Sequence, residues 1–284
     1  MAIVVAEHVD KRFPDGAGRS RKVLDDVGFT VRKGETVGII GPNGSGKSTL
    51  LRLISGVETA SGGRVLLKGK EAAAYPRKQL ARWLAVLQQD ALPPIGFTVR
   101  EVIGMGRYPY QNWLGDERED PSALIESVME RLGLTALADR TLERLSGGER
   151  QRVALGKVMV QEPELLLLDE PTTFLDIGYQ VQMMDYIRDW QRESGLTVVA
   201  VLHDLNLAAQ YCDRIIVLHE GRKVREGPPA DVIESDLIAS VYGTRPIVLP
   251  HPVSLAPQIL LTPGDHSRNA HQPAIFSANS HERG

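Results

Sequence analysis

The chain has 284 residues, of which 42% are hydrophobic and 24% are charged, and its formal net charge is -3. This length and composition suit one large globular domain or a core with an insert, and the slightly negative charge gives no basic footprint for nucleic acid. The single cysteine, Cys212, excludes a disulfide within the chain and is expected to be a small buried residue, and no apolar stretch approaches the length of a membrane span.

Two kinds of strand pattern occur along the chain. Short alternating stretches at residues 3 to 9, 23 to 31 and 64 to 68 predict an antiparallel sheet. Continuous apolar runs elsewhere predict the buried strands of a parallel core. These core strands are expected to end at Gly41, Gln88, Asp169 and His203. The pattern as a whole indicates an α/β fold.

Helical periodicity dominates between Gln89 and Leu145. It predicts helices at residues 98 to 106 and 121 to 132, separated by a polar stretch at 111 to 120. We therefore expect this region to form a helical subdomain inserted into the parallel core.

The C-terminal third of the chain predicts a β-hairpin at residues 214 to 226 and short helices up to Tyr242. From His251 onward, four prolines and scattered polar residues predict a flexible tail. The predicted division is a domain at residues 1–250, with the helical subdomain inserted at about 90–163, and a tail at 251–284.

A glycine-rich segment of the form G-x-x-x-x-G-K-[ST] follows the apolar run at residues 37 to 40. The apolar period of a helix resumes at Leu50, so the segment lies at the strand-to-helix turn that phosphate binding requires. Glycines there can adopt positive φ and let backbone N–H groups converge on a phosphate, which also meets the positive end of the helix. A lysine adds positive charge and a serine offers a hydroxyl ligand for Mg²⁺. The predicted phosphate loop comprises Gly41, Pro42, Asn43, Gly44, Ser45, Gly46, Lys47, Ser48 and Thr49.

Two carboxylates, Asp169 and Glu170, follow the four leucines at residues 165 to 168. Acids at the carboxyl end of a parallel strand face the crevice where open α/β sheets bind ligands. We expect Asp169 to hold Mg²⁺, directly or through water, and Glu170 to act as general base on an attacking water. The alternative is a capping or ion-paired couple at a strand end, which the phosphate loop disfavours.

A second motif, Leu-Ser-Gly-Gly-Glu-Arg-Gln-Arg-Val, occupies residues 145 to 153. Ser146 and Glu149 form a capping box, which predicts the start of a helix here. With the phosphate loop and this motif together, the chain resembles the ATP-binding subunits of ABC transporters. The resemblance covers approximately residues 3 to 249. It implies a P-loop NTPase core of ABC ATPase type, with an antiparallel β subdomain and an inserted helical subdomain.

The resemblance also implies roles for residues that their own patterns leave open. His203 matches the switch histidine, which in this family contacts the γ-phosphate of ATP; a lone histidine after a strand is more often structural. Gln89 matches the Q-loop glutamine, which joins the Mg²⁺ and water site to the mobile helical subdomain. Its alternative is an exposed polar residue at a strand end. We therefore assign Glu170, His203 and Gln89 to catalysis, and Ser48, Gln89 and Asp169 to Mg²⁺.

Further positions are expected to meet ATP across a dimer. By resemblance, Ser146, Gly147 and Gly148 face the γ-phosphate of ATP bound to a second copy, while the Glu149 carboxylate folds back onto the helix cap.

Phe13 matches the aromatic residue that stacks on adenine, although a core or loop aromatic is the alternative. Asp176 matches the residue that contacts the opposite subunit, although its position also suits the N-cap of the following helix.

Within this family, three segments resemble the ATPases that drive import of ferric siderophores, haem or cobalamin. The implied partners are a second copy of the chain, integral membrane permease subunits and, indirectly, a substrate-binding protein, with ATP and Mg²⁺ as ligands and no nucleic acid. Residues 1 to 8 lack the layout of a signal peptide, so we expect a peripheral subunit on the cytoplasmic face of the membrane. The segments are Gly106-Arg107-Tyr108-Pro109, residues 170 to 177 and residues 201 to 209.

Two other functions share the same site motifs. An exporter ATPase uses the same machinery. A soluble ABC ATPase acting on nucleic acid or ribosomes would normally carry a coiled-coil insertion or a second cassette, and the sequence shows neither.

Overall fold

The computed structural model describes residues 1–14, 19–88, 92, 96–112, 115–117, 119–173 and 175–261. A six-stranded sheet in the order β10-β9-β3-β8-β7-β6 forms its centre, and all neighbouring strands are parallel except β10 with β9. The predicted parallel core and the predicted hairpin after Asp213 are therefore confirmed. The strands are β3 (Thr36–Ile40), β6 (Leu84–Leu87), β7 (Leu165–Asp169), β8 (Thr197–Val201), β9 (Arg214–His219) and β10 (Arg222–Gly227).

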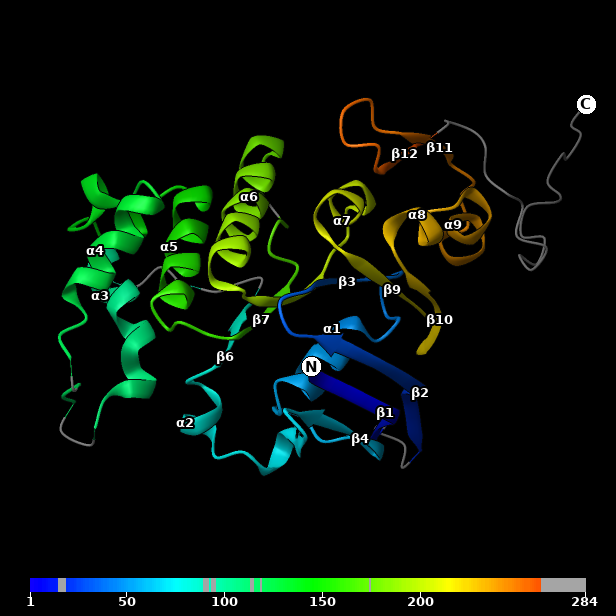
Figure 1. Cartoon of the computed structure of the whole chain (residues 1–284), viewed down its shortest axis with the longest axis horizontal. Coiled ribbons are helices and arrows are strands. Elements are labelled where there is room, and N and C mark those ends of the chain that lie inside the picture. The colour runs from blue at the N-terminus through cyan, green and yellow to red at the C-terminus, as the bar shows by residue number, and fades with distance from the viewer. Residues whose placement is uncertain are drawn as a thin grey trace, which may run out of the picture.

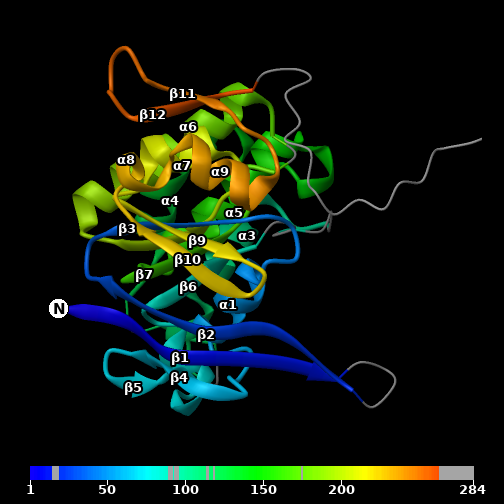
Figure 2. The same ribbon diagram turned by 90° about the vertical axis from the view of Figure 1, so that its right-hand side faces the viewer.

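A second, antiparallel sheet in the order β2-β1-β4-β5 lies beside the first (Figure 1). Its strands were predicted correctly in kind, but the first two are longer than the alternation indicated, and Figure 2 shows them running together as a long ribbon. Helix α1 packs between this sheet and the central one. The elements are β1 (Ala2–Pro14), β2 (Ser20–Arg32), α1 (Lys47–Ile54), β4 (Gly62–Leu67), β5 (Lys70–Glu71) and α2 (Arg77–Leu80).

Both faces of the central sheet are covered, as parallel sheets require. Along β7, Leu166 and Leu168 point into a core shared with the helices, whereas Leu165 and Leu167 point into the core beneath the antiparallel sheet. All four leucines are fully buried, so β7 has no solvent-facing side. Cys212 is buried as predicted, and burial raises the pKa of its thiol to about 12.

The helical subdomain lies at one end of the central sheet (Figure 1). Thr98 caps its first helix in a capping box with Glu101, and Gly106 lets the following turn approach the carbonyl of Lys157. Its helices are α3 (Val99–Gly104), α4 (Ser122–Arg131) and α5 (Gly147–Met159), with a 3-10 helix at Met105–Tyr110.

The remaining helices cover the face of the central sheet that lies away from the antiparallel sheet. The chain then turns back over these helices (Figure 2). The prediction of a flexible tail from residue 251 is wrong for residues 257 to 260, because they pair with 247 to 250 in a hairpin. Residues 262 to 284 lie outside the described residues. The elements are α6 (Ile177–Ser194), α7 (Leu205–Tyr211), α8 (Pro229–Val232), α9 (Ser235–Tyr242), β11 (Ile247–Pro250) and β12 (Pro257–Leu260).

Across the residues that the structure describes, none of the helices combines the length and the apolar character needed to cross a membrane.

The close approach at Gly106 gives a test of the helical subdomain. A Cβ added there would lie 2.0 Å from the carbonyl oxygen of Lys157, a contact that backbone must move to relieve. We expect Gly106→Ala to destabilise the protein by about 1–3 kcal/mol, measured by thermal or denaturant unfolding. Gly178→Ala is the matched control, because a Cβ at Gly178 meets nothing within 4 Å. Equal stability of the two variants would contradict the packing described.

Candidate nucleotide-binding and hydrolysis site

Three neighbouring strand ends bring the predicted site together. Strand β8 lies between β3 and β7, with Val201 in register with both Ile39 and Asp169. The segment after β3 is the phosphate loop, and the segment after β8 carries His203. Residues separated by more than 150 positions in sequence therefore meet at one edge of the sheet, where open α/β sheets place their ligands.

Gly41, Gly44 and Gly46 of the phosphate loop all have positive φ, and at Gly41 and Gly46 a side chain would also clash. Gly41 has φ 151° and Gly46 has φ 103°, which is backbone that side chains rarely allow. A Cβ on Gly41 would lie 2.0 Å from the carbonyl oxygen of Leu218, and one on Gly46 would lie 2.6 Å from Leu24 Cδ2. The loop is thus fixed in shape by its neighbours and leads directly into α1 at Lys47.

Lys47 lies inside this loop and is only 5% exposed. Its ammonium donates to the carbonyl oxygens of Gly41 at 2.8 Å and Pro42 at 3.0 Å. Burial lowers the pKa of Lys47, and the nearby carboxylates of Glu170 and Asp169 oppose that effect. Within the part of the chain that the structure describes, the only hydrogen-bond acceptors of this buried ammonium are two neutral carbonyl oxygens. An anion that replaced them would stabilise the charge more strongly.

The hydroxyl of Ser45 is also buried, and it has no hydrogen-bond partner among the described residues. Buried polar atoms normally find a partner. An unpartnered donor beside a buried lysine, at the start of a helix, fits a phosphate group.

Ser48 and Asp169 bring a hydroxyl and a carboxylate together from α1 and β7. The Ser48 hydroxyl donates to Asp169 Oδ1 at 3.0 Å. Burial raises the pKa of Asp169, and the charge of Glu170 raises it further, while the hydrogen bond from Ser48 opposes both. Oxygen ligands of this kind suit Mg²⁺, and a divalent cation would relieve the repulsion between the two carboxylates. The residues present therefore fit the metal.

Glu170 and His203 form a close pair, with Nε2 of the imidazole 2.5 Å from Oε1 of the carboxylate. Glu170 has φ 54°, an unusual backbone for a residue with a side chain. Its N–H donates to the Val201 carbonyl at 3.2 Å, so β8 holds this bend in place. Strained backbone of this kind clusters at functional sites. Here the bend aims the carboxylate at the histidine.

The Ser146 to Glu149 segment forms the predicted capping box at the start of α5. The Ser146 N–H donates to Glu149 Oε2 at 2.7 Å, which lowers the pKa of Glu149 and confirms that this carboxylate folds back onto the cap. The ring of Tyr179 from α6 covers Gly148, where a Cβ would lie 2.9 Å from Cδ1 of the ring. Gln151 donates to the Pro171 carbonyl at 3.1 Å and so connects α5 to the segment after β7.

Two of the peripheral predictions have a defined environment. Phe13 lies at the end of β1, and Lys11 Nζ approaches its ring centroid at 4.7 Å while also pairing with Glu58. Asp176 takes the N-cap position of α6, but its side chain accepts no capping hydrogen bond and is exposed. Gln89 lies outside the described residues, just beyond the end of β6 at Leu87.

Two residues at the site went unnoticed in the sequence. The hydroxyl of Thr173 donates to Glu170 Oε2 at 3.4 Å. The phenol of Tyr242 lies near the backbone of Gly41, which lowers the pKa of the phenol. Burial dominates and raises the pKa of Tyr242 to about 12. Only the position of Thr173 close after Glu170 could have signalled a role; nothing in sequence connects Tyr242 to the loop.

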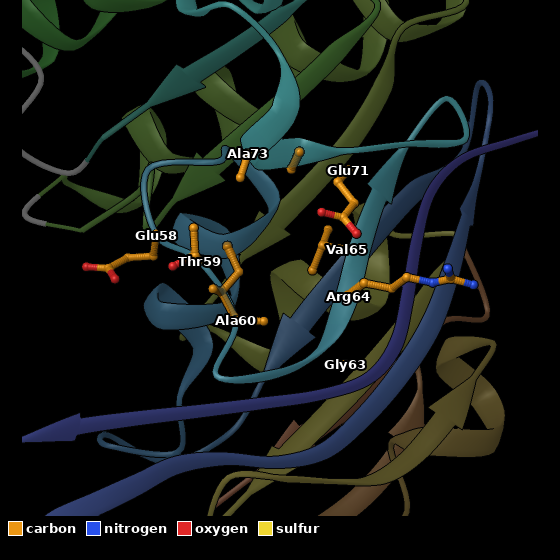
Figure 3. Close-up of a pocket in the computed structure, with 10 residues that line it drawn as sticks. Glu58, Thr59, Ala60, Gly63, Arg64, Val65, Glu71 and Ala73 are labelled. Carbon is orange, nitrogen blue, oxygen red and sulfur yellow. The ribbon is translucent and has the colours of Figure 1, made fainter.

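A separate cavity of about 120 Å³ lies at the far end of α1, next to β4 (Figure 3). It is lined by residues such as Glu58, Val65 and Glu71, and contains none of the predicted site residues. The predicted nucleotide site is therefore distinct from this cavity.

The comparisons with known proteins agree with this geometry. A family model described as ABC transporter matches residues 24–173, more than half of the chain. The chain belongs to the ABC transporter family of ATP-binding proteins, and it is an ATPase coupled to transport.

Curated relatives extend this match over most of the chain. The ferric enterobactin transport ATP-binding protein FepC of Escherichia coli is 39% identical over 84% of this chain and 88% of its own length. The hemin import ATP-binding protein HmuV of Rhodococcus jostii is 46% identical over 84% of this chain and 81% of its own length. The uncharacterized ABC transporter ATP-binding protein YvrA of Bacillus subtilis is 43% identical over 87% of this chain, which spans 56% of that relative.

Among solved structures, the ATP-binding cassette MJ0796, a dimer in a post-hydrolysis state with ADP and Pi, is 28% identical with a TM-score of 0.69. The match covers 79% of this chain and 98% of that one. Together with the family match, it shows that the fold is that of an ABC ATPase, whose nucleotide is ATP or its product ADP.

The burial of Asp169 gives a test of the site. In Asp169→Asn the amide keeps an acceptor for Ser48 but carries no charge, so we expect the nucleotide-free protein to melt at a higher temperature while Mg²⁺-dependent ATP hydrolysis is lost. Because the folded-state pKa of Asp169 is raised, the gain is full at neutral pH, fades as pH falls through that raised pKa, and is gone below the ordinary aspartate pKa of about 3.9. Melting curves across this pH range measure it.

The control is Asp139→Asn, since Asp139 is exposed and its neutralisation should leave the melting temperature unchanged. An Asp169→Asn variant that melts at or below the wild-type temperature at pH 7 would contradict the role of burial.

Proposed function

We propose that this chain is the ATP-hydrolysing subunit of an importer for ferric siderophores or a related iron complex, with haem and cobalamin as the other cargo candidates. The observation that carries the hydrolytic part is the meeting of Lys47, the Ser48–Asp169 pair and the Glu170–His203 pair at one sheet edge. The cargo class rests on the relatives, which include ATPases named for ferric enterobactin and for hemin.

The chemistry follows from the positions of the donors and acceptors. Residues 41 to 49 bind the β- and γ-phosphates through backbone N–H groups, and the Lys47 ammonium turns from the loop carbonyls to the phosphate oxygens. Ser48 and Asp169, with Gln89, would hold Mg²⁺, which would neutralise charge on the phosphate oxygens. Phe13 stacks on the base.

Hydrolysis then uses the Glu170–His203 pair. Glu170 accepts a proton from a water molecule as its oxygen bonds to the γ-phosphorus, and the bond to the bridging oxygen breaks to release ADP and phosphate. His203 contacts the γ-phosphate and orients the carboxylate through the 2.5 Å contact between them. Thr173 adds a second restraint on the same carboxylate.

A second copy of the chain completes the site. We infer that Ser146, Gly147 and Gly148 at the start of α5 bind the γ-phosphate of ATP held by the partner copy, while Asp176 contacts that copy directly. The Glu149 carboxylate bonds the cap and so does not compete with phosphate. The exposed position of Asp176, without a capping bond, suits a contact across the dimer.

The membrane partner is an integral permease, to which the chain binds on the cytoplasmic face of the membrane. A hollow of about 230 Å³ lies between the end of β6 and α5, and its lining includes Leu87, Leu92 and Lys157. This position between the core and the helical subdomain suits a permease helix, because closure of the ATP dimer would then move that helix. A substrate-binding protein would deliver cargo to the permease.

The general-base assignment predicts the behaviour of Glu170→Gln. The amide keeps the shape of the side chain but cannot take up the proton, so kcat should fall at least about a hundredfold while ATP still binds. The ATP-bound dimer should accumulate, and size-exclusion chromatography with Mg²⁺ and ATP measures it. Lys47→Ala, which should neither bind ATP nor dimerise with it, is the control. Rapid turnover by Glu170→Gln would refute the assignment.

Uptake measurements test the cargo. A strain lacking this gene, and lacking redundant importers, is complemented with the wild type or Glu170→Gln and supplied with radiolabelled ferric siderophore, haem or cobalamin. We expect one uptake activity to be lost on deletion and restored only by the wild type. If all three activities are unaffected, the cargo proposal fails while the ATPase assignment stands.

A further inference from the structure

The C-terminal hairpin β11–β12 is joined to α7 by one amide side chain. Asn206 Oδ1 accepts the N–H of Ile259 at 2.7 Å, and Asn206 Nδ2 donates to the carbonyl of the same residue at 3.3 Å. The side chain therefore satisfies both backbone groups of Ile259, as a neighbouring strand would. Both views show the hairpin next to α7, and Figure 2 shows it on the side away from the antiparallel sheet.

Asn206 lies three residues after His203, at the second position of α7. Its own N–H donates to Asp204 Oδ1 at 2.8 Å, and that carboxylate also accepts the N–H of Leu207 at 3.0 Å. At the other end of this segment, the Leu202 N–H donates to the Ile39 carbonyl at 3.2 Å. The loop that carries His203 is thus held at one end by a hydrogen bond to β3 and at the other end by the N-cap of α7.

Neither α7 nor the hairpin has much stability of its own. Helix α7 has seven residues and the hairpin has two strands, and isolated elements of these sizes are marginal in water. The hairpin is anchored by the Ser235 hydroxyl, which donates to the Pro246 carbonyl at 2.7 Å, and by partly buried Val248 and Ile259 against the helical core. Asn206 connects this anchored hairpin to the first turn of α7.

We propose that Asn206 is a positioning residue for ATP hydrolysis: by binding Ile259 it fixes the start of α7 and thereby the imidazole of His203 beside Glu170. This inference rests on the proposed role of His203. The phosphate loop belongs to β3 and α1 and has no bond to Asn206 among the described residues, so nucleotide binding does not depend on this contact.

The test compares steady-state ATP hydrolysis by the full-length wild type and Asn206→Ala. Losing one hydrogen-bonded pair should lower kcat by about three- to tenfold. The KM for ATP should stay within about twofold, because the phosphate loop is intact. Gln258→Ala is the matched control, since the amide of Gln258 lies on the same strand but donates to Pro257 of its own chain segment. It should hydrolyse ATP like the wild type.

Ile259→Pro breaks the contact from the other side. The Ile259 N–H is donated to Asn206 and not to β11, so proline at this position removes that bond and leaves the hairpin ladder in place. Because the substitution also removes the packed Ile259 side chain, Ile259→Ala, which keeps the N–H, is the control for lost packing. We expect Ile259→Pro to give the same fall in kcat. This variant decides the matter if Asn206→Ala proves too unstable to assay, and melting temperatures of all variants are measured alongside.

The outcomes are separable. If kcat is unchanged in a folded Asn206→Ala or Ile259→Pro variant, or if KM changes in place of kcat, the positioning role is wrong. If the wild type hydrolyses ATP no faster than Lys47→Ala, the proposed hydrolytic function itself fails. A fall in kcat confined to Asn206→Ala and Ile259→Pro supports the inference.

Discussion

Charge held away from water at the carboxyl edge of β3, β8 and β7 is the constraint on which the site depends. Burial lowers the pKa of Lys47 and raises that of Asp169, so each ionised group is destabilised where it lies. The loop carbonyls and the Ser48 hydroxyl compensate only in part. An anion at Lys47 and a cation at Asp169 would supply the missing opposite charges, so the site is electrostatically incomplete as it stands.

The rigidity of the surrounding sheet makes this arrangement possible. Strands β3 and β8 are buried along their whole length, and each is paired on both sides. Such a framework can hold backbone that would otherwise relax, including the positive φ of Gly41 and Glu170. The strained bend at Glu170 places its carboxylate next to His203 from the neighbouring strand. Backbone strain here is therefore part of how the Glu170–His203 pair is oriented.

The outer elements are connected to this framework by single polar contacts as well as by packing. Gln151 joins α5 to the segment after β7, and Asn206 joins α7 to the hairpin. The phenol of Tyr242 in α9 lies near the backbone of Gly41. Each contact connects an outer element to a segment next to the candidate site. An ATPase coupled to transport must pass the difference between its ATP-bound and ATP-free forms to a partner. A single polar contact between two packed elements can serve this purpose, because it is either made or broken.

The fold class, the parallel core and the capping box of α5 could be predicted from sequence, because each depends on local pattern: apolar runs, glycine spacing, and Ser146 three residues before Glu149. The phosphate loop and the two carboxylates could also be predicted from their sequence motifs. The tail prediction was wrong for the second strand of the hairpin because proline and polar residues in an edge hairpin look like a loop in sequence. Gln89 and residues beyond 261 lie outside the described part of the chain.

What the sequence determined by itself is the set of chemical groups and the turns that carry them. The tertiary structure alone decided which groups meet: Glu170 with His203, Ser48 with Asp169, Asn206 with Ile259, and Gly41 with Tyr242. The reason is physical. Motifs arise from hydrogen bonding and periodicity over a few residues, whereas these pairs are set by strand order and register, which depend on burial of apolar faces across the whole domain.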